Sequence, residues 1–215
     1  ELERVRSFGA VVLSSADPRY PQKLSELDDA PPLLYVKGNI ALLNHRPAVA
    51  VVGTRNATII GRKLTSKISF ELTENDVLIV SGMARGIDAA AHKGAMYAKE
   101  RRGPTIAVLG TGIDRIYPPE NEELYHQIGE QGLLVSEYPM GTNAQSGNFP
   151  RRNRIVAALS EAVLVAEATG KSGSLITARM AADRNRLIFA GKRVRKAPIR
   201  FCAAARCGRK TPPTF

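Results

Sequence analysis

Six short, nearly continuous apolar runs recur along the chain and limit the folds that it can adopt. They lie at residues 48–52, 77–81, 105–109, 133–135, 162–167 and 186–190. Most are separated by stretches with helical character, which lie at residues 58–74, 85–99, 121–130 and 173–184. Apolar strands that alternate with helices are typical of a parallel sheet covered on both faces. We therefore predict an α/β fold with an extended Rossmann-like, doubly wound and mostly parallel sheet.

Changes in composition predict three regions. Residues 1–45 contain short segments interrupted by proline, including an expected short strand at residues 33–36. We interpret this region as an N-terminal extension that packs on the main domain, residues 46–190. Residues 191–215 form an atypical basic tail without acidic residues, and we expect this tail to be disordered. The first residue is Glu, and we expect the chain to be an internal fragment of a longer protein.

The net charge of +11 suggests a nucleic-acid partner, but its distribution weakens that argument. Nine of the 31 basic residues and none of the 20 acidic residues lie in residues 186–215. Residues 1–185 therefore hold 22 basic and 20 acidic residues. A nucleic-acid site in the folded part must depend on local clustering of charge.

Ligands of doubly wound sheets bind at the carboxyl ends of the strands, so the segments after each run are the candidate site. These segments are GTRNAT (53–58), SGMARGID (81–88), GTGIDRIYPPEN (110–121), SEYPMG (136–141) and EATGKSGS (167–174). Most are rich in Gly, Ser and Thr, whose backbone N–H groups can hold phosphates. Arg55 is either a phosphate contact or a solvated surface arginine.

Several familiar motifs are incomplete. GTGIDR resembles a dinucleotide fingerprint, but Arg115 replaces its third glycine. GKS at 170–172 lacks the glycine of a P-loop, because Val165 occupies that position. The three histidines are scattered, which argues against a zinc site. We predict no catalytic residues, no metal and no cofactor. The two cysteines indicate no disulfide framework and favour a reducing, cytoplasmic setting.

Asp88 and His92 lie four residues apart on one expected helix face. They could form a catalytic pair, although a structural pairing of the acid with the histidine is the stronger interpretation. Ser172 or Ser174 is expected to cap the helix that follows.

The stretch SGNFPRRNRIV (146–156) places Phe149 before Pro150 in a basic segment. Phe149 could be a hydrophobic staple before a helix that has Pro150 at its first position. It could equally be a platform on which a base stacks beside arginines that bind phosphate. Spacing alone leaves the two interpretations equal.

Six motifs in order resemble the DNA-processing protein A family, DprA or Smf. They are GTR, SGMARGIDAAAH, AVLGTGIDRIYPPEN, SEYPMG, GNFPRRNRIVAALS and EATGKSGSLITA, and the resemblance covers roughly residues 12–190. It implies a bacterial, cytoplasmic protein of natural transformation. No apolar run in the sequence approaches the roughly 20 residues that span a bilayer, so we expect no membrane segment. Such a protein binds and protects incoming single-stranded DNA, loads the recombinase RecA and helps displace single-strand-binding protein. The family acts as a homodimer and is not known as an enzyme.

The resemblance also implies roles for individual residues. Arg55 matches an arginine that contacts DNA phosphate, and Phe149 matches an aromatic on which a base stacks. The residues matching those that line the pocket are Arg152, Asn153 and Arg154. The residues matching loop positions near the DNA backbone are Gly53, Ser81, Gly82 and Ser174. Some family members carry a lysine where this chain has Ser146, and Lys171 is the candidate to replace that contact.

An enzymatic alternative is a nucleotide hydrolase of the phosphoribohydrolase type, which shares a Rossmann-like sheet with glycine-rich loops. Its characteristic Pro-Gly-Gly-x-Gly-Thr segment does not occur in this sequence. Beyond residue 190, the motifs of the DprA family are not recognisable, which we interpret as a change of reading frame or a cloning artefact (hypothesis).

Overall fold

The structure is a computed structural model that describes residues 1–45, 47–98, 105–169 and 172–191. The strands are β1 (Val11–Ser14), β2 (Leu33–Gly38), β3 (Ala48–Gly53), β4 (Leu78–Ser81), β5 (Thr105–Val108), β6 (Leu133–Ser136), β7 (Ala162–Glu167) and β8 (Leu187–Ala190). The α-helices are α1 (Leu2–Ser7), α2 (Gln22–Ser25), α3 (Ile59–Glu74), α4 (Ile87–Met96), α5 (Glu122–Gln131), α6 (Asn148–Ala158) and α7 (Ser174–Ala182). Two short 3₁₀ helices are η1 (Ile40–Asn44) and η2 (Pro119–Asn121).

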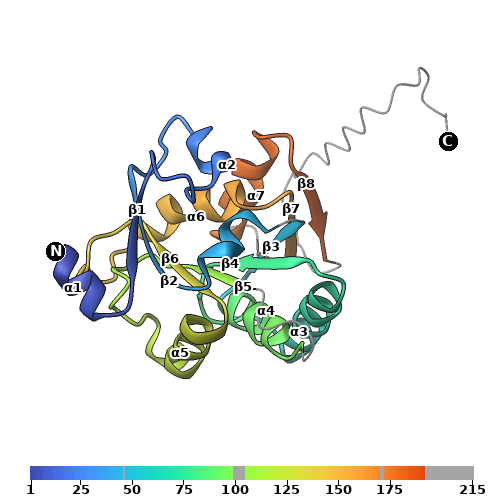
Figure 1. Cartoon of the computed structure of the whole chain (residues 1–215). Coiled ribbons are helices and arrows are strands. Elements are labelled where there is room, and N and C mark those ends of the chain that lie inside the picture. Colours follow the sequence, from blue (N-terminus) through green and yellow to red (C-terminus); the bar gives the residue numbers. More distant parts are fainter. Residues whose placement is uncertain (46, 99–104, 170–171, 192–215) are drawn as a thin grey trace, which may run out of the picture.

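One sheet of eight strands in the described residues organises the molecule (Figure 1). Its order is β1-β2-β6-β5-β4-β3-β7-β8, and neighbours from β6 through β8 run parallel. Each of the six expected apolar runs becomes a strand of this parallel part. The predicted α/β fold with a doubly wound, mostly parallel sheet is therefore confirmed.

The N-terminal region contributes two antiparallel strands to the same sheet. β2 pairs with β6, with Tyr35 opposite Ser136, and β1 pairs with β2 at the edge. The strand expected at residues 33–36 is present as β2, whereas β1 was not expected. Its apolar segment is only four residues long and gives a weak sequence signal.

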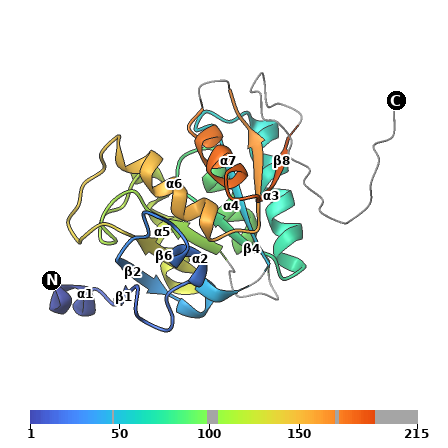
Figure 2. The ribbon, with the colours of Figure 1, turned by 90° about the horizontal axis from the view of Figure 1, so that it is seen from above.

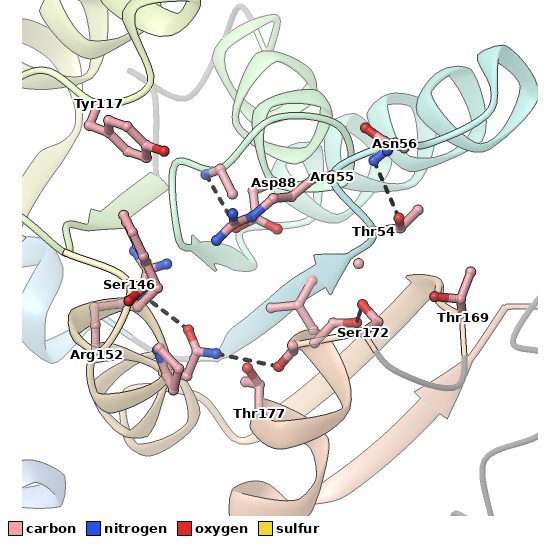
Figure 3. A pocket seen from close by; sticks show the side chains of 18 of the residues that line it. Thr54, Arg55, Asn56, Asp88, Tyr117, Ser146, Arg152, Thr169, Ser172 and Thr177 are labelled. Atoms are coloured by element: carbon pink, nitrogen blue, oxygen red, sulfur yellow. Dashed lines mark hydrogen bonds between the residues drawn. The ribbon is translucent and has the colours of Figure 1, made fainter. Parts of the chain in front are cut away.

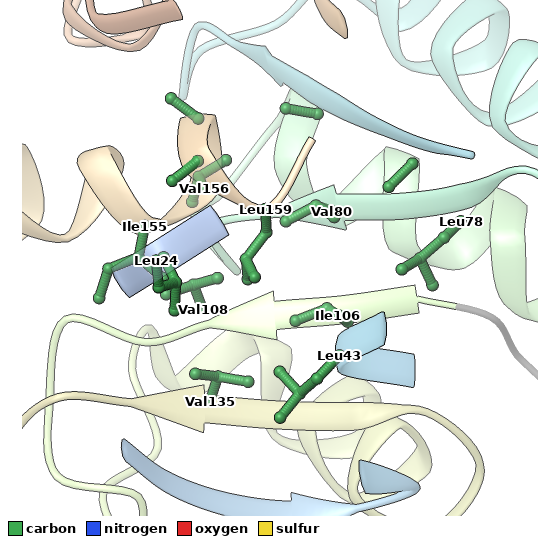
Figure 4. Close-up of a cluster of buried hydrophobic side chains, with 14 of the residues drawn as sticks. Leu24, Leu43, Leu78, Val80, Ile106, Val108, Val135, Ile155, Val156 and Leu159 are labelled. Atoms are coloured by element: carbon green, nitrogen blue, oxygen red, sulfur yellow. The ribbon is translucent and has the colours of Figure 1, made fainter. Parts of the chain in front are cut away.

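Helices cover both faces of the sheet. α3, α4 and α5 lie on one face, and α2, α6 and α7 lie on the other (Figures 1 and 2). On the second face, Ile155 and Val156 of α6 and the capping residue Leu159 pack against buried side chains of the central strands, such as Val80 and Val108 (Figure 4). This packing explains why the strands read as continuous apolar runs, since both of their faces are covered.

The chain reverses its direction across the sheet at β3. From β3 the strands advance through β4, β5 and β6, and the chain then returns to place β7 on the other side of β3. Loops from both halves therefore diverge at the carboxyl ends of β3 and β7, where doubly wound sheets bind ligands. This topology locates the site described below.

The helices α3 and α4 pack unusually closely. A Cβ atom added to Gly94 of α4 would lie 2.2 Å from the backbone oxygen of Ser66 in α3. The buried side of α3 consists of small polar side chains, Thr65, Ser69 and Thr73, while several of its apolar residues are exposed.

In the described part of the chain, no helix has the length and apolar character needed to cross a membrane.

Candidate nucleic-acid interface

A pocket of about 570 Å³ opens at the carboxyl ends of the parallel strands (Figure 3). Loops after β3, β4, β5, β6 and β7 all contribute to it, together with the beginnings of α6 and α7. Its polar and aromatic lining consists of Thr54, Arg55, Asn56, Asp88, Tyr117, Ser146, Phe149, Arg152, Asn153, Thr169, Ser172, Ser174 and Thr177. The pocket therefore lies at the edge of the sheet where the topology predicts a ligand site.

Phe149 lies at the second position of α6, half-buried at the boundary of two hollows. One is the pocket, and the other is a smaller hollow of about 200 Å³, here called the bridging hollow. The ring of Phe149 packs on Gly110, where an added Cβ would lie 2.7 Å from the ring. The centroid of the Tyr117 ring is 5.2 Å away, with 31° between the two planes. The interpretation of Phe149 as a staple before the helix is wrong, because the helix begins at Asn148 and Pro150 is its third residue.

Arg55 reaches over the same ring from the loop after β3. Its guanidinium carbon lies 5.3 Å from the centroid of Phe149, a distance at which a cation and an aromatic face attract. The side chain is exposed, and among the described residues it forms no salt bridge. Arg55 is therefore a cation available to a ligand beside an aromatic surface.

Arg152 supplies a second positive charge, but from within the protein. The residue is 3 % exposed, and its Nη1 donates to the backbone oxygen of Gly82 at 2.6 Å and to that of Val108. Its Nε donates to Oδ1 of Asn153 at 3.2 Å. Burial lowers the pKa of Arg152 to about 10, so the guanidinium stays charged at neutral pH. Arg152 thus joins the ends of β4 and β5 to α6 and gives the pocket floor a fixed positive charge.

Asp88, in the first turn of α4, lies close to this arginine. A Cβ added to Gly82 would lie 2.5 Å from Nη2 of Arg152 and 2.7 Å from Oδ2 of Asp88. Burial raises the pKa of Asp88, while Arg152 and the backbone N–H groups of Ala84 and Gly82 favour its charged form. A side chain at position 82 would displace the guanidinium of Arg152, the carboxylate of Asp88, or both.

The loop after β3 depends on two other glycines. Gly86 has φ +76°, and an added Cβ would lie 2.4 Å from the oxygen of Thr54. An added Cβ at Gly53 would lie 2.4 Å from Cγ1 of Ile87. Without side chains at these positions, the Arg55 loop can pack against the start of α4.

The start of α7 forms the opposite wall of the pocket. Oγ of Ser174 lies 2.7 Å from Oγ of Ser172, and Nδ2 of Asn153 donates to the oxygen of Gly173 at 3.5 Å. The capping residue is Gly173, and no side chain caps the helix, so the expected cap by Ser172 or Ser174 is wrong. The two hydroxyl groups line the pocket instead.

Comparison with known proteins identifies the family. The sequence model of the family described as DNA recombination-mediator protein A matches residues 11–205. The chain belongs to this family. The match extends beyond residue 190, where the recognisable motifs end.

Relatives of known name agree with this assignment. Protein Smf of Synechocystis sp. is 50 % identical over 194 residues, which cover 87 % of this chain and 47 % of the relative. DNA processing protein DprA of Streptococcus pneumoniae is 48 % identical over 190 residues, covering 88 % of this chain and 64 % of that protein. The chain therefore spans about half to two thirds of the length of these curated relatives.

Two solved structures of DprA proteins share the fold. The X-ray structure from Streptococcus pneumoniae matches with a TM-score of 0.78 and 47 % identity, over 84 % of this chain and 62 % of that one. The structure from Helicobacter pylori, which concerns that protein's single-stranded DNA binding mode, has a TM-score of 0.78 and 33 % identity. It covers 87 % of this chain and 83 % of that one.

The structure brings most of the expected family residues to the pocket and its bridging hollow. These residues are Gly53, Arg55, Gly82, Phe149, Arg152, Asn153 and Ser174. Lys171 lies outside the described residues, and so does the basic tail from residue 192.

Arg154 and Ser81 do not line the pocket. Arg154 is 3 % exposed and turns away to form a bidentate salt bridge with Glu137, with both N···O distances 2.8 Å. It also bonds the carboxylate of Asp29, at 2.7 Å. Ser81 is buried and donates to the backbone oxygen of Val51 at 2.6 Å. The expectation that Arg154 lines the pocket is wrong, because successive helix positions point in different directions. Ser81, the last residue of β4, bonds to the neighbouring strand β3, and its expected place near the DNA backbone stays a prediction.

The expected pairing of Asp88 with His92 is also wrong. Nδ1 of His92 lies 2.7 Å from Oγ1 of Thr105, while Asp88 accepts from the backbone N–H of Ala84 at 3.4 Å. Burial lowers the pKa of His92 to about 3, and Arg152 contributes to the same shift. A neutral, fully buried imidazole of this kind serves packing rather than proton transfer.

Tyr117 is an aromatic site residue that the sequence analysis did not single out. It lies in the loop after β5, is 40 % exposed, and borders both the pocket and the bridging hollow. The available signal was a scarce aromatic in a segment that follows a strand, but the partner of this ring is distant in sequence.

Proposed function

We propose that the pocket binds single-stranded DNA, with one base on Phe149 and phosphates at Arg55 and the loops. One observation carries the proposal: an incompletely buried aromatic ring at a pocket mouth, with an available guanidinium directly over it. Aromatic platforms beside cations are the usual device for holding single strands, because every base offers a π-face.

The remaining geometry supports this choice. The start of α7 presents backbone N–H groups and hydroxyls to the pocket, which suits phosphate. Arg152 adds a charge whose position is set by backbone carbonyls rather than by solvent. The related protein from Helicobacter pylori has a structure concerned with single-stranded DNA binding.

The wider role of the protein follows from its family. We propose a recombination mediator of natural transformation that protects incoming single strands, loads RecA and helps displace single-strand-binding protein. We further propose a homodimer that acts in the cytoplasm as a binding protein rather than an enzyme. RecA loading would be tested by the lag before RecA begins ATP hydrolysis on single strands coated with single-strand-binding protein, which the active protein should shorten.

The central test replaces the platform. Phe149→Ala should weaken binding of a fluorescent oligothymidylate by about 1–3 kcal/mol, the typical worth of one stacked base. Phe149→Trp should retain most of the affinity. Phe70→Ala is the matched control, since Phe70 is a partly exposed phenylalanine of α3 outside the pocket. Unchanged affinity in Phe149→Ala by fluorescence anisotropy would exclude the stacking role.

A further inference from the structure

A second basic hollow lies between α3 and α4, on the face of the sheet opposite α6 and α7. This α3–α4 groove has a volume of about 530 Å³, and the side chains along it include Arg62, Lys63, Arg85, Lys93, Tyr97 and Glu120. Its floor contains the small residues Ala89 and Ala90 of α4. The close packing at Gly94 holds the two helices side by side (Figure 1). Long side chains from both helices line the groove.

Like the pocket, the groove combines positively charged side chains with an exposed aromatic ring. Among the described residues that line it, four cations accompany one carboxylate, that of Glu120, whose oxygen lies 2.6 Å from Nη2 of Arg85. Tyr97 is 68 % exposed, in a chain with only six tyrosines. An exposed aromatic among cations is suited to a base next to phosphates.

The groove is continuous with the pocket. Arg85 lines both the groove and the bridging hollow, and Phe149 lines both the bridging hollow and the pocket. A strand that leaves Phe149 can therefore pass over Arg85 and enter the groove.

We infer that the α3–α4 groove is an extension of the single-strand site, which binds nucleotides beyond those held in the pocket. This inference rests on the proposed function. Lys63 and Lys93 contact phosphates, and Tyr97 stacks on a base. Short oligonucleotides fill the pocket alone, and longer ones gain affinity from the groove.

The test compares oligothymidylates of about 4 to 16 nucleotides, the range of single-strand site sizes known for OB folds, by anisotropy at several salt concentrations. For the longest oligomers, Lys63→Ala/Lys93→Ala should abolish the gain in affinity with length. It should also lower the magnitude of the salt slope by about 0.7 for each phosphate that the variant no longer binds. Tyr97→Ala should weaken the binding of long oligomers at least about fivefold, which is the lower limit for the loss of one stacked base. For the shortest oligomers, all these variants should bind like the unmodified chain.

Lys67→Ala is the matched control, because Lys67 lies one turn from Lys63 on α3 and pairs with Glu71 outside the groove. All these side chains are exposed, and thermal unfolding will verify that the variants fold. Suppose that the double variant binds long oligomers with unchanged affinity and salt slope, while Phe149→Ala still binds weakly. This result would refute DNA binding by the groove and leave the proposed role of the pocket unaffected. Loss of RecA binding with normal DNA affinity would refute DNA binding by the groove in favour of a protein partner. Failure of the unmodified chain to bind any single strand would refute the proposed function itself.

Discussion

Replacing Arg154 should cost stability and leave DNA affinity almost unchanged, although its neighbours Arg152 and Asn153 line the pocket. Arg154→Met keeps most of the apolar stem but removes the bidentate salt bridge to Glu137. The Glu137 side chain is 5 % exposed, so its carboxylate would remain buried without its main partner. Breaking a buried pair in this way costs about 3–5 kcal/mol.

The structure favours the lower end of that range. Nε of Arg151 lies 3.6 Å from Oε2 of Glu137 and would remain as a partial partner. Asp29 is 62 % exposed and can return to water at little cost. A loss of about 3 kcal/mol corresponds to a decrease in melting temperature of roughly 6–12 °C for a domain of this size.

Two measurements on each variant separate the roles. Urea unfolding reports stability, and anisotropy at a temperature where the variant is folded reports affinity for single strands. Arg151→Ala is the control, since its side chain is 65 % exposed and such surface pairs contribute about 0–1 kcal/mol. Arg154→Met/Glu137→Leu should recover much of the lost stability, because it removes both charges. A variant Arg154→Met with unchanged stability and weakened DNA binding would refute this assignment and restore Arg154 to the interface.

Three further predictions address the site and its support. The pKa of His92 is about 3 in the fold and about 6.5 when unfolded, so the unfolded chain binds more protons as pH falls below 6.5. Between pH 8 and pH 5 the protein should lose about 2 kcal/mol more stability than His92→Gln does, measured by urea unfolding; equal losses would contradict the buried neutral imidazole. Gly86→Ala should destabilise the fold by at least about 1–3 kcal/mol because φ is +76°, whereas Gly147→Ala, with open space around its Cβ, should be nearly neutral in thermal unfolding. Tyr117→Ala should weaken single-strand binding by about 0.5–1.5 kcal/mol because the Phe149 ring would no longer be supported by its neighbour, and anisotropy equal to that of the unmodified chain would exclude this supporting role.

Local patterns account for much of the fold prediction. Runs such as residues 48–52 and 105–109 are apolar along nearly their whole length because both faces of their strands are covered, so their pattern indicates the parallel sheet directly. β1 was missed because an edge strand buries little: it is four residues long, and only Leu13 is buried. Position at the carboxyl ends of strands, together with the motif resemblance, likewise indicated Arg55 and Phe149.

The sequence by itself therefore determined the fold class, the edge of the sheet that carries the pocket, and two residues expected to contact a ligand there. Only the tertiary structure decided which polar side chains face the pocket. Arg152 and Arg154 are two residues apart in one basic stretch, yet one lies at the pocket floor and the other is held by Glu137. The contact between the rings of Tyr117 and Phe149 could not be predicted from the sequence either. The physical reason is that a side chain's direction and its partners depend on contacts between segments distant in the chain, and no local pattern records those contacts.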